Sequence, residues 1–133
     1  MIGIDTNVLV RLIVGDDSLQ KEVALATLRM RCTNQNPGFI NRIVICELAW
    51  VLKRVYRFQR ESIADAIEAL LRSSVFEVED ASDVWGALWE FRNSKADFPD
   101  CLLAQTNLSA GCSSIISFDK EAGGIGGFEI LQP

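Results

Sequence analysis

The stretch MIGIDTNVLVR, residues Met1–Arg11, decides how the rest of the chain is interpreted. Its first four residues predict a short strand that ends at Asp5, and the apolar run that restarts at Val8 predicts a helix. In open α/β sheets, ligands bind beyond the carboxyl ends of the strands. An acid at such an end is therefore expected to face a site rather than the core.

The rest of the chain alternates between predicted strands and helices. Strands are expected at 38–40, 75–78, 113–117 and 128–131, and helices at 8–14, 18–31, 41–56, 61–72, 82–92 and 97–110. In the second helix, Leu19, Val23 and Met30 recur at helical spacing. This alternation predicts an α/β fold with a central parallel sheet of four to five short strands flanked by helices. With 133 residues, the chain is expected to form a single domain over residues 1–133.

The composition excludes several classes of site. The chain has no histidine, which removes the usual zinc sites, the Ser-His-Asp triad and the commonest general base. The glycine-rich stretch 123–127 lacks the lysine and hydroxyl of a phosphate-binding loop and is expected to be a flexible connector. The cysteines lack CxxC spacing and are expected to be reduced thiols; they are Cys32, Cys46, Cys101 and Cys112.

The sequence also bears on location. No apolar run reaches the roughly 18 residues that a membrane helix needs. The N-terminus lacks the basic region of a secretory signal and carries Asp5 within its apolar part. A cytoplasmic protein without a membrane segment is therefore expected.

Five acids stand at positions that suit a site. Asp5 and Asp119 each follow a predicted strand, so neighbouring parallel strands would bring them to one crevice. Glu47 is the single acid in a helix that is apolar on nearly every face, and a buried carboxylate there needs a partner. Asp97 and Asp100 share one face of the first turn of a helix, where capping of the helix end is the alternative, more so for Asp97 than for Asp100.

Acids gathered without a compensating base would repel one another, and a divalent cation would resolve that conflict. Ligation by oxygen alone selects Mg²⁺ or Mn²⁺. One such ion, or a pair, can orient a water for attack on a phosphodiester and stabilise the leaving oxygen. The pattern therefore predicts phosphodiester hydrolysis without a covalent intermediate.

Four segments together carry a resemblance to a known family. IDTNVLVR at 4–11, VICELAWVL at 44–52, ADFPDCLLA at 96–104 and IISFDK at 115–120 resemble the signature segments of PIN-domain ribonucleases, with the VapC-type toxins of toxin–antitoxin pairs as the most similar subgroup. The resemblance implies a PIN-like fold, Mg²⁺- or Mn²⁺-dependent endoribonuclease activity on RNA, and a homodimer. It also implies inhibition by a cognate antitoxin whose tail enters the acidic groove.

The resemblance also assigns roles to the acids. Asp5, Glu47 and Asp100 match the family's metal-binding acids, and Asp119 matches its fourth acid, which often acts through a second metal or water. Asp97 matches an extra acid of one motif variant. Three polar neighbours also match the family. Thr6 and Asn7 match residues that orient Asp5, and Ser117 matches a hydroxyl position beside Asp119. None of the three is expected to bind the metal.

The net charge of −5 argues against RNA binding by the bare surface. The densest basic run comprises Lys53, Arg54, Arg57 and Arg60, for which solvated cations at a helix C-terminus are the alternative to RNA contact. Arg11 is another candidate phosphate contact. Trp85 and Trp89, one turn apart, are expected to be core or dimer-contact aromatics.

Two other functions fit parts of the pattern. A Mg²⁺-binding receiver-like signalling domain fits the acids and the α/β alternation, but it would want paired acids where Thr6-Asn7 follows Asp5. A catalytically inactive PIN-like binding module is the second alternative, and metal titration would distinguish it.

Overall fold

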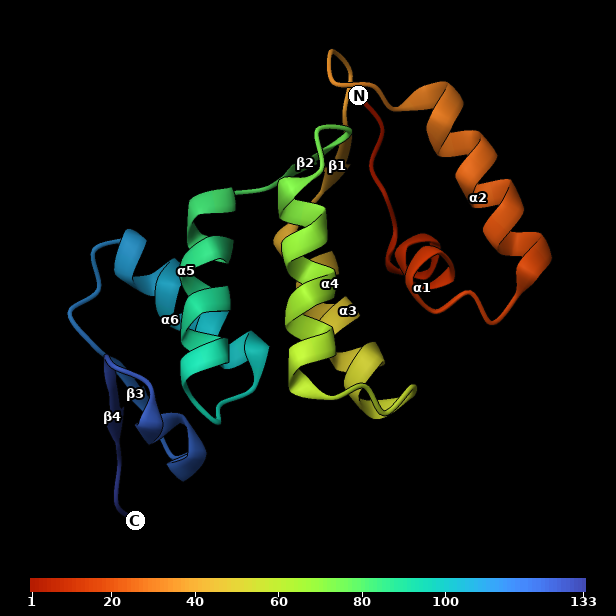
Figure 1. The fold of residues 1–133 in the computed structure, drawn as a ribbon. Coiled ribbons are helices and arrows are strands. Elements are labelled where there is room, and N and C mark those ends of the chain that lie inside the picture. The colour runs from red at the N-terminus through yellow and green to blue at the C-terminus, as the bar shows by residue number, and fades with distance from the viewer. The chain divides into compact units, whose positions relative to one another are not determined.

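A computed structural model describes residues 1–133, which form two compact units, Met1–Ala81 and Ser82–Pro133. Each unit is described by itself (Figure 1). The first contains α1 (Thr6–Val14), α2 (Ser18–Arg31), β1 (Gly38–Ile40), α3 (Arg42–Arg54), α4 (Arg60–Arg72) and β2 (Phe76–Val78). Five further elements follow, which are α5 (Ala81–Asn93), α6 (Phe98–Ser109), β3 (Ile115–Ser117), the 3₁₀ helix η1 (Lys120–Gly124) and β4 (Phe128–Ile130).

The strands of the first unit form a parallel pair. β1 pairs with β2 so that Phe39 stands opposite Glu77. On the other side of β1, the N-terminal segment forms only an isolated parallel bridge between Gly3 and Phe39. Two hydrogen bonds hold it, from Ile4 N to the Phe39 carbonyl (2.9 Å) and from Phe39 N to the Ile2 carbonyl (2.7 Å). The predicted first strand is thus reduced to one bridge. Asp5 still follows directly after the last residue that bonds to β1, which is Ile4.

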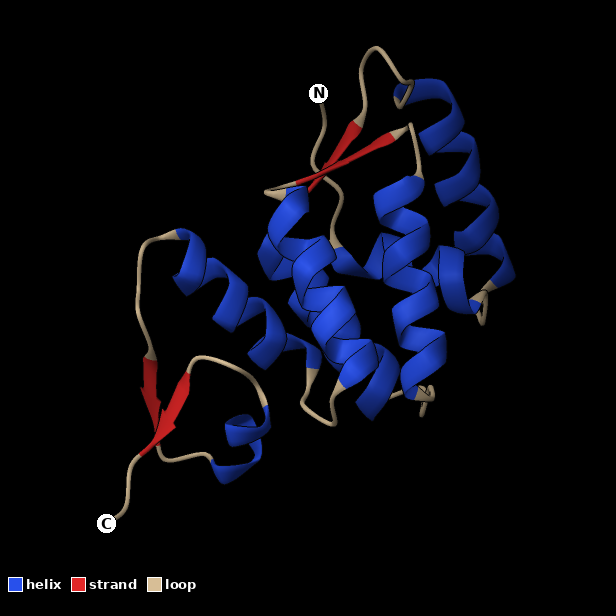
Figure 2. Cartoon of the chain, turned by 60° about the vertical axis from the view of Figure 1, so that its left-hand side comes forward, coloured by secondary structure: helices blue, strands red, loops and turns tan.

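The second unit has its own parallel pair, β3 and β4 (Figure 2). Ile115 stands opposite Phe128, and η1 makes the crossover between the two strands. Part of the predicted connector at 123–127 is therefore helical. The chain is α/β with parallel strands, as predicted, but it forms two-stranded pairs rather than a sheet of four to five strands. Each strand is three residues long, so it supplies few ladder hydrogen bonds.

α3 forms the centre of the first unit's core. The Asn41 side chain caps it by accepting from Val44 N at 2.8 Å, as predicted. Its buried face consists of Val44, Ile45, Leu48, Ala49 and Leu52. The expectation that the whole helix is buried is wrong, because Ile43 is 74% exposed, Trp50 is 56% exposed and Glu47 is also exposed. Two large apolar side chains of this helix, Ile43 and Trp50, are therefore uncovered.

α1 and α2 form a hairpin whose second helix is mostly uncovered. α1 ends at Gly15, whose φ of 68° lies in the left-handed region, and Asp17 caps α2 by accepting from Gln20 N at 3.0 Å. Leu28 is the one buried residue of α2. The predicted apolar face of α2 exists, but Leu19 and Val23 on that face are 74% and 66% exposed.

Aromatic side chains anchor the second unit. The rings of Phe91 on α5 and Phe98 on α6 are both buried and pack edge to face, with centroids 5.7 Å apart. Trp85 is half-buried, whereas Trp89 is 65% exposed. None of the helices combines the length and the apolar character needed to cross a lipid bilayer.

Candidate metal centre

Asp5 stands at the junction between the N-terminal segment and α1. Its backbone is extended, and its carboxylate caps the helix by accepting from Thr6 N at 2.8 Å. Because Asp5 is the cap, α1 begins at Thr6, two residues before the predicted start. The residue is exposed. One oxygen of Asp5 is therefore fixed by the backbone while the carboxylate still reaches solvent.

Thr6 carries an unusual polar group directly after this carboxylate. The residue is 3% exposed, and its hydroxyl oxygen Oγ1 is buried without a hydrogen-bond partner. A buried polar group left unpaired costs about 1–3 kcal/mol. The unpaired hydroxyl of Thr6 therefore lowers the stability of the fold, which makes it a candidate for a functional role.

Glu47 lies on the exposed side of α3, so the argument that burial forces it to find a partner is wrong. The buried residues Leu48 and Ala49 follow it on the opposite side of the helix. The side chain of Glu47 is therefore accessible to solvent, as a ligand for a hydrated cation must be. Asp5 and Glu47 are the two predicted site acids of the first unit.

The other three predicted acids belong to the second unit. Asp97 occupies the N-cap position of α6, but its side chain makes no capping hydrogen bond, so a capping box is not formed. Asp100 lies in the first turn of the same helix. Asp119 caps η1 by accepting from Glu121 N at 3.0 Å, and its own N–H donates to the Ser117 hydroxyl at 3.0 Å.

These acids influence one another electrostatically. Partial burial raises the pKa of Asp100 above its ordinary value, and the negative charges of Asp119, Asp97 and Glu121 raise it further. None of the groups that shift this pKa is a cation. Glu121 was not predicted from the sequence. Its position two residues after Asp119, in the turn that Asp119 caps, is the signal that could have indicated it.

The donor set fits a hard divalent cation. All the candidate ligands are carboxylates, and like charges that raise the pKa of one member are the situation that a bound cation relieves. Within neither unit do three acids or cysteines come close enough to hold a metal ion by themselves. A centre with Asp5, Glu47, Asp97, Asp100 and Asp119 as ligands needs both units, and it stays a prediction.

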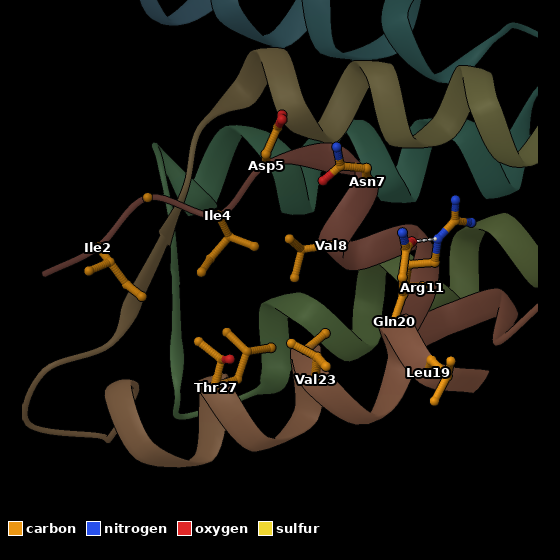
Figure 3. Close-up of a pocket in the computed structure, with 13 residues that line it drawn as sticks. Ile2, Ile4, Asp5, Asn7, Val8, Arg11, Leu19, Gln20, Val23 and Thr27 are labelled. Carbon is orange, nitrogen blue, oxygen red and sulfur yellow. Dashed lines mark hydrogen bonds between the residues drawn. The ribbon is translucent and has the colours of Figure 1, made fainter. Parts of the chain in front are cut away.

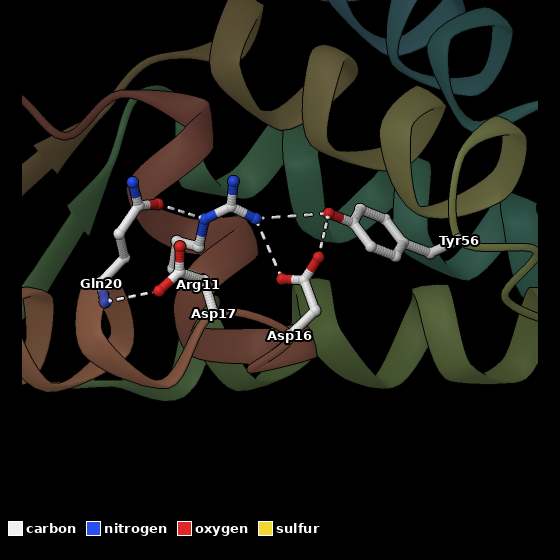
Figure 4. A network of polar contacts seen from close by, with 5 residues as sticks. All are labelled: Arg11, Asp16, Asp17, Gln20 and Tyr56. Carbon is white, nitrogen blue, oxygen red and sulfur yellow. Dashed lines mark hydrogen bonds and ion pairs between the residues drawn. The ribbon is translucent and has the colours of Figure 1, made fainter.

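Arg11, whose role as a phosphate contact stays a prediction, takes part in a polar network (Figure 4). Its Nη1 donates to Asp16 Oδ1 at 2.9 Å and to the Tyr56 hydroxyl at 3.3 Å, and its Nε donates to Gln20 Oε1 at 2.5 Å. The hydrogen bond with Tyr56 and the nearby Asp16 charge raise the pKa of Arg11. This network ties the α1–α2 hairpin to the turn after α3.

A groove runs between α1 and α2 beside Asp5 (Figure 3). It has a volume of about 680 Å³ and mostly apolar walls. Ile2, Ile4 and Val8 line one side, and Leu19, Val23 and Thr27 of α2 line the other. Asp5, Asn7 and Arg11 also border it. The groove of this unit is thus apolar with a polar border, rather than acidic throughout.

The sequence matches the PIN domain family over residues 2–126. The chain belongs to the PIN domain family. The match runs through both units of this PIN-domain protein and includes all five predicted site acids. The chain is also similar to a VapC ribonuclease from Aquifex aeolicus (strain VF5), with 27% identity over 95 residues, which cover 71% of this chain and 70% of the relative. The resemblance seen in the four signature segments is therefore confirmed.

Proposed function

We propose that this PIN-domain protein is a divalent-metal-dependent endoribonuclease and the toxin of a toxin–antitoxin pair. The observation that carries the proposal concerns the acids of the second unit: partial burial raises the pKa of Asp100, and the negative charges of Asp119, Asp97 and Glu121 raise it further. Repulsion of this kind lowers stability unless a cation relieves it. The similarity to a VapC ribonuclease supports RNA as the substrate.

Each acid has a proposed role. Asp5, Glu47 and Asp100 would hold Mg²⁺ or Mn²⁺, and Asp119 and Asp97 would act through a second ion or a water. The bound ion would supply an activated water and stabilise the leaving oxygen. The chain's own contribution is orientation: the Thr6 N–H fixes one oxygen of Asp5, and the Ser117 hydroxyl and the Glu121 N–H fix the turn that carries Asp119.

The direct test is hydrolysis of RNA with Mg²⁺, Mn²⁺ or EDTA, comparing the wild type with Asp5→Asn and Asp100→Asn. Removal of one metal ligand is expected to lower the rate by about 100-fold or more, in line with the several kcal/mol of transition-state stabilisation that such ions supply. Glu22→Gln is the matched control, because Glu22 is an exposed acid on α2 outside the candidate centre. Equal rates in all four proteins, or full activity in EDTA, would reject the mechanism.

An inhibitory protein partner is the second part of the proposal. The groove between α1 and α2 supports it, because Leu19 and Val23 expose apolar surface that the rest of the unit leaves uncovered. An amphipathic segment laid into such a groove would bury this surface. Since Asp5 borders the groove, its occupant would also obstruct the proposed centre.

This part is tested by coexpression with the product of a short adjoining reading frame. Val23→Glu is expected to keep its RNA hydrolysis and to arrest growth even when the partner is present, because a charge in the groove disfavours the apolar segment. Glu22→Gln, which does not line the groove, is expected to remain suppressed. Suppression of both variants would show that the partner binds elsewhere.

A homodimer is the remaining part of the proposal. The 65% exposed indole of Trp89 supports a contact between copies through α5, since large aromatic side chains are enriched at protein interfaces. Light scattering on the wild type and on Trp89→Ala measures it directly. A wild-type mass of one chain would reject the dimer.

Two alternative functions were considered from the sequence, a receiver-like signalling domain and a catalytically inactive PIN-like module. Membership of the PIN family leaves the receiver-like signalling domain without support. The catalytically inactive PIN-like module is addressed by metal titration together with the hydrolysis assay, because it predicts no cleavage even with saturating Mn²⁺.

A further inference from the structure

One face of α3 presents opposite charges on either side of a tryptophan. Ile43, Glu47, Trp50 and Arg54 follow one another at intervals of four, three and four residues, which places them along one stripe of the helix. Ile43 is 74% exposed and Trp50 is 56% exposed, and Glu47 and Arg54 are exposed as well. We refer to these four residues as the α3 stripe.

The two charges of the stripe have no partner within the chain. The structure shows no ion pair and no side-chain hydrogen bond for Glu47 or for Arg54. They cannot pair with each other, because seven residues separate them by about 10 Å along the helix axis. The carboxylate and the guanidinium are therefore both available to a partner outside the chain.

The order of these charges makes the stripe complementary to a second copy of itself. Residues 47 and 54 lie at equal distances in sequence from a point between Trp50 and Val51. If a two-fold axis passes through that point, two α3 helices pack antiparallel, and Glu47 of each copy faces Arg54 of the partner copy. The two Trp50 side chains then meet at the centre. A parallel pair in the same register would instead place like charges opposite each other.

We propose that the α3 stripe is a contact surface for a second copy of this chain, with the two α3 helices antiparallel. The indoles of Trp50 form the apolar centre of this contact, and aromatic side chains and arginine are enriched in such interfaces. Exposed ion pairs add little affinity, whereas like charges placed opposite each other are strongly unfavourable. Glu47 and Arg54 therefore select the antiparallel register more than they strengthen the contact.

The same charges distinguish a second copy from a strand of nucleic acid. Phosphates would be attracted to Arg54 but repelled by Glu47, whereas a second copy supplies an opposite charge to each residue. One helix from each copy gives a small interface, and small interfaces belong to weak, transient complexes. The association is therefore expected to depend on protein concentration.

The test measures the mass of the protein by light scattering and sedimentation over a wide range of concentration in EDTA. Arg54→Glu turns both ion pairs into pairs of like charges and is expected to raise the Kd of the pair by about tenfold or more. Glu47→Arg is expected to do the same. The double variant with both changes exchanges the two charges, so association is expected to return close to that of the wild type.

Arg29→Glu is the matched control, because Arg29 is an exposed arginine on α2 and the change in net charge is the same as in Arg54→Glu. It is expected to associate like the wild type. The whole series is also measured with Trp89→Ala, which removes the contact proposed on α5. A pair formed through α3 keeps its dependence on residues 47 and 54 in that background.

Three results would overturn the inference. A wild-type mass of one chain at every concentration would leave the stripe to a different occupant, such as RNA or an unrelated protein. Association of Arg54→Glu that equals that of the wild type would show that the stripe is not in the contact. Failure of the charge exchange to restore association, with a circular dichroism spectrum like that of the wild type, would reject the antiparallel register.

The inference goes beyond the proposed function and meets it at Glu47. The same carboxylate oxygens cannot both accept from Arg54 of the partner copy and hold a cation, so Mn²⁺ is expected to weaken the association if both proposals hold. Association that Mn²⁺ leaves unchanged would count against Glu47 as a ligand and not against the pair. Hydrolysis of RNA by Asp5→Asn and Asp100→Asn tests the nuclease without changing α3, so either proposal can fail alone.

Discussion

The Tyr56 hydroxyl donates a hydrogen bond of 2.9 Å to Oδ2 of Asp16, and it joins the turn after α3 to the short connection between α1 and α2. Arg11 bonds to both groups, so the three side chains form a closed triangle (Figure 4). The hydrogen bond from Tyr56 and the charge of Arg11 hold the pKa of Asp16 below its ordinary value. Hydrogen bonds from Tyr56, which follows α3, thereby help to hold the α1–α2 hairpin that forms the apolar groove.

Replacement of Tyr56 by Phe is expected to destabilise the protein in a pH-dependent way. Because the pKa of Asp16 is lowered in the folded state, this group contributes stability above its ordinary value of 3.8, and the contribution is lost as the pH falls through the lowered folded value. Thermal melts should therefore show a lower Tm for Tyr56→Phe near neutral pH and a smaller difference in acid. A cycle with Asp16→Asn isolates the pair, and additive effects would show that the two residues are not coupled.

Replacement of Asp100 by Asn is expected to have the opposite pH dependence. The pKa of Asp100 is raised in the folded state, so its contribution is fully present below the ordinary value of 3.8 and is lost as the pH rises through the raised value. In EDTA near neutral pH, Asp100→Asn should melt at a modestly higher temperature than the wild type, and the two should converge in acid. A lower Tm for the variant under these conditions would contradict the assigned repulsion.

Replacement of Thr6 by Val tests the unpaired hydroxyl. Valine has nearly the same shape and removes a buried oxygen that has no partner, so stability is expected to stay unchanged or to rise by up to about 1 kcal/mol. If the hydroxyl serves the metal centre beside Asp5, RNA hydrolysis should fall at the same time. Denaturant unfolding and hydrolysis measured on one preparation separate the two effects, with Thr6→Ser as the variant that keeps the hydroxyl.

Reversal of Arg54 and Arg57 to Glu tests the basic run after α3. Both residues are exposed, and if they contact phosphates the reversal should weaken binding of single-stranded RNA. The slope of log K against log salt should also flatten by about 0.7 for each contact that is lost. An unchanged slope would assign these arginines to solvent and to the end of the helix dipole. Reversal of Arg29 and Arg31 on α2, which lie outside the run, is the control for net charge.

Most elements of the fold could be predicted because each depends on local chemistry. The bounds of α2 were predicted from Asp17 and the spacing of its apolar residues, and the start of α3 was predicted from Asn41. The strand at 38–40 was also placed correctly. The extent of the sheet could not be predicted, because pairing depends on which short strands meet, and Met1–Ile4 contributes one bridge only.

Exposure was the weakest part of the prediction. The apolar spacing of α2 indicated a face correctly, but spacing does not reveal whether anything covers that face. The same holds for α3. Its apolar residues Ile43 and Trp50 led to the prediction that the helix is buried on all sides, and therefore that Glu47 is buried, whereas all three residues are exposed.

The candidate site was predicted unevenly for a related reason. Asp119 and Asp100 could be found because they stand at element ends, and their mutual influence is a feature of the second unit. Glu121 could have been found from its position two residues after Asp119, whereas the triangle of Arg11, Asp16 and Tyr56 depends on turns whose shape the sequence does not specify. The single metal centre that would join Asp5 and Glu47 with the other acids stays a prediction.

Gly15 imposes a restriction on how such a protein can diversify. Its left-handed backbone is strained for any other residue, and a Cβ there would lie 3.2 Å from Nζ of Lys21. The three-residue connection at 15–17 is therefore hard to lengthen or remodel without moving α2. If the proposed inhibitory partner occupies the groove, related proteins with different partners are expected to keep this hairpin and to vary side chains at positions such as Leu19 and Val23. Discrimination between partners would then depend on the shape of the groove and not on the length of the connection.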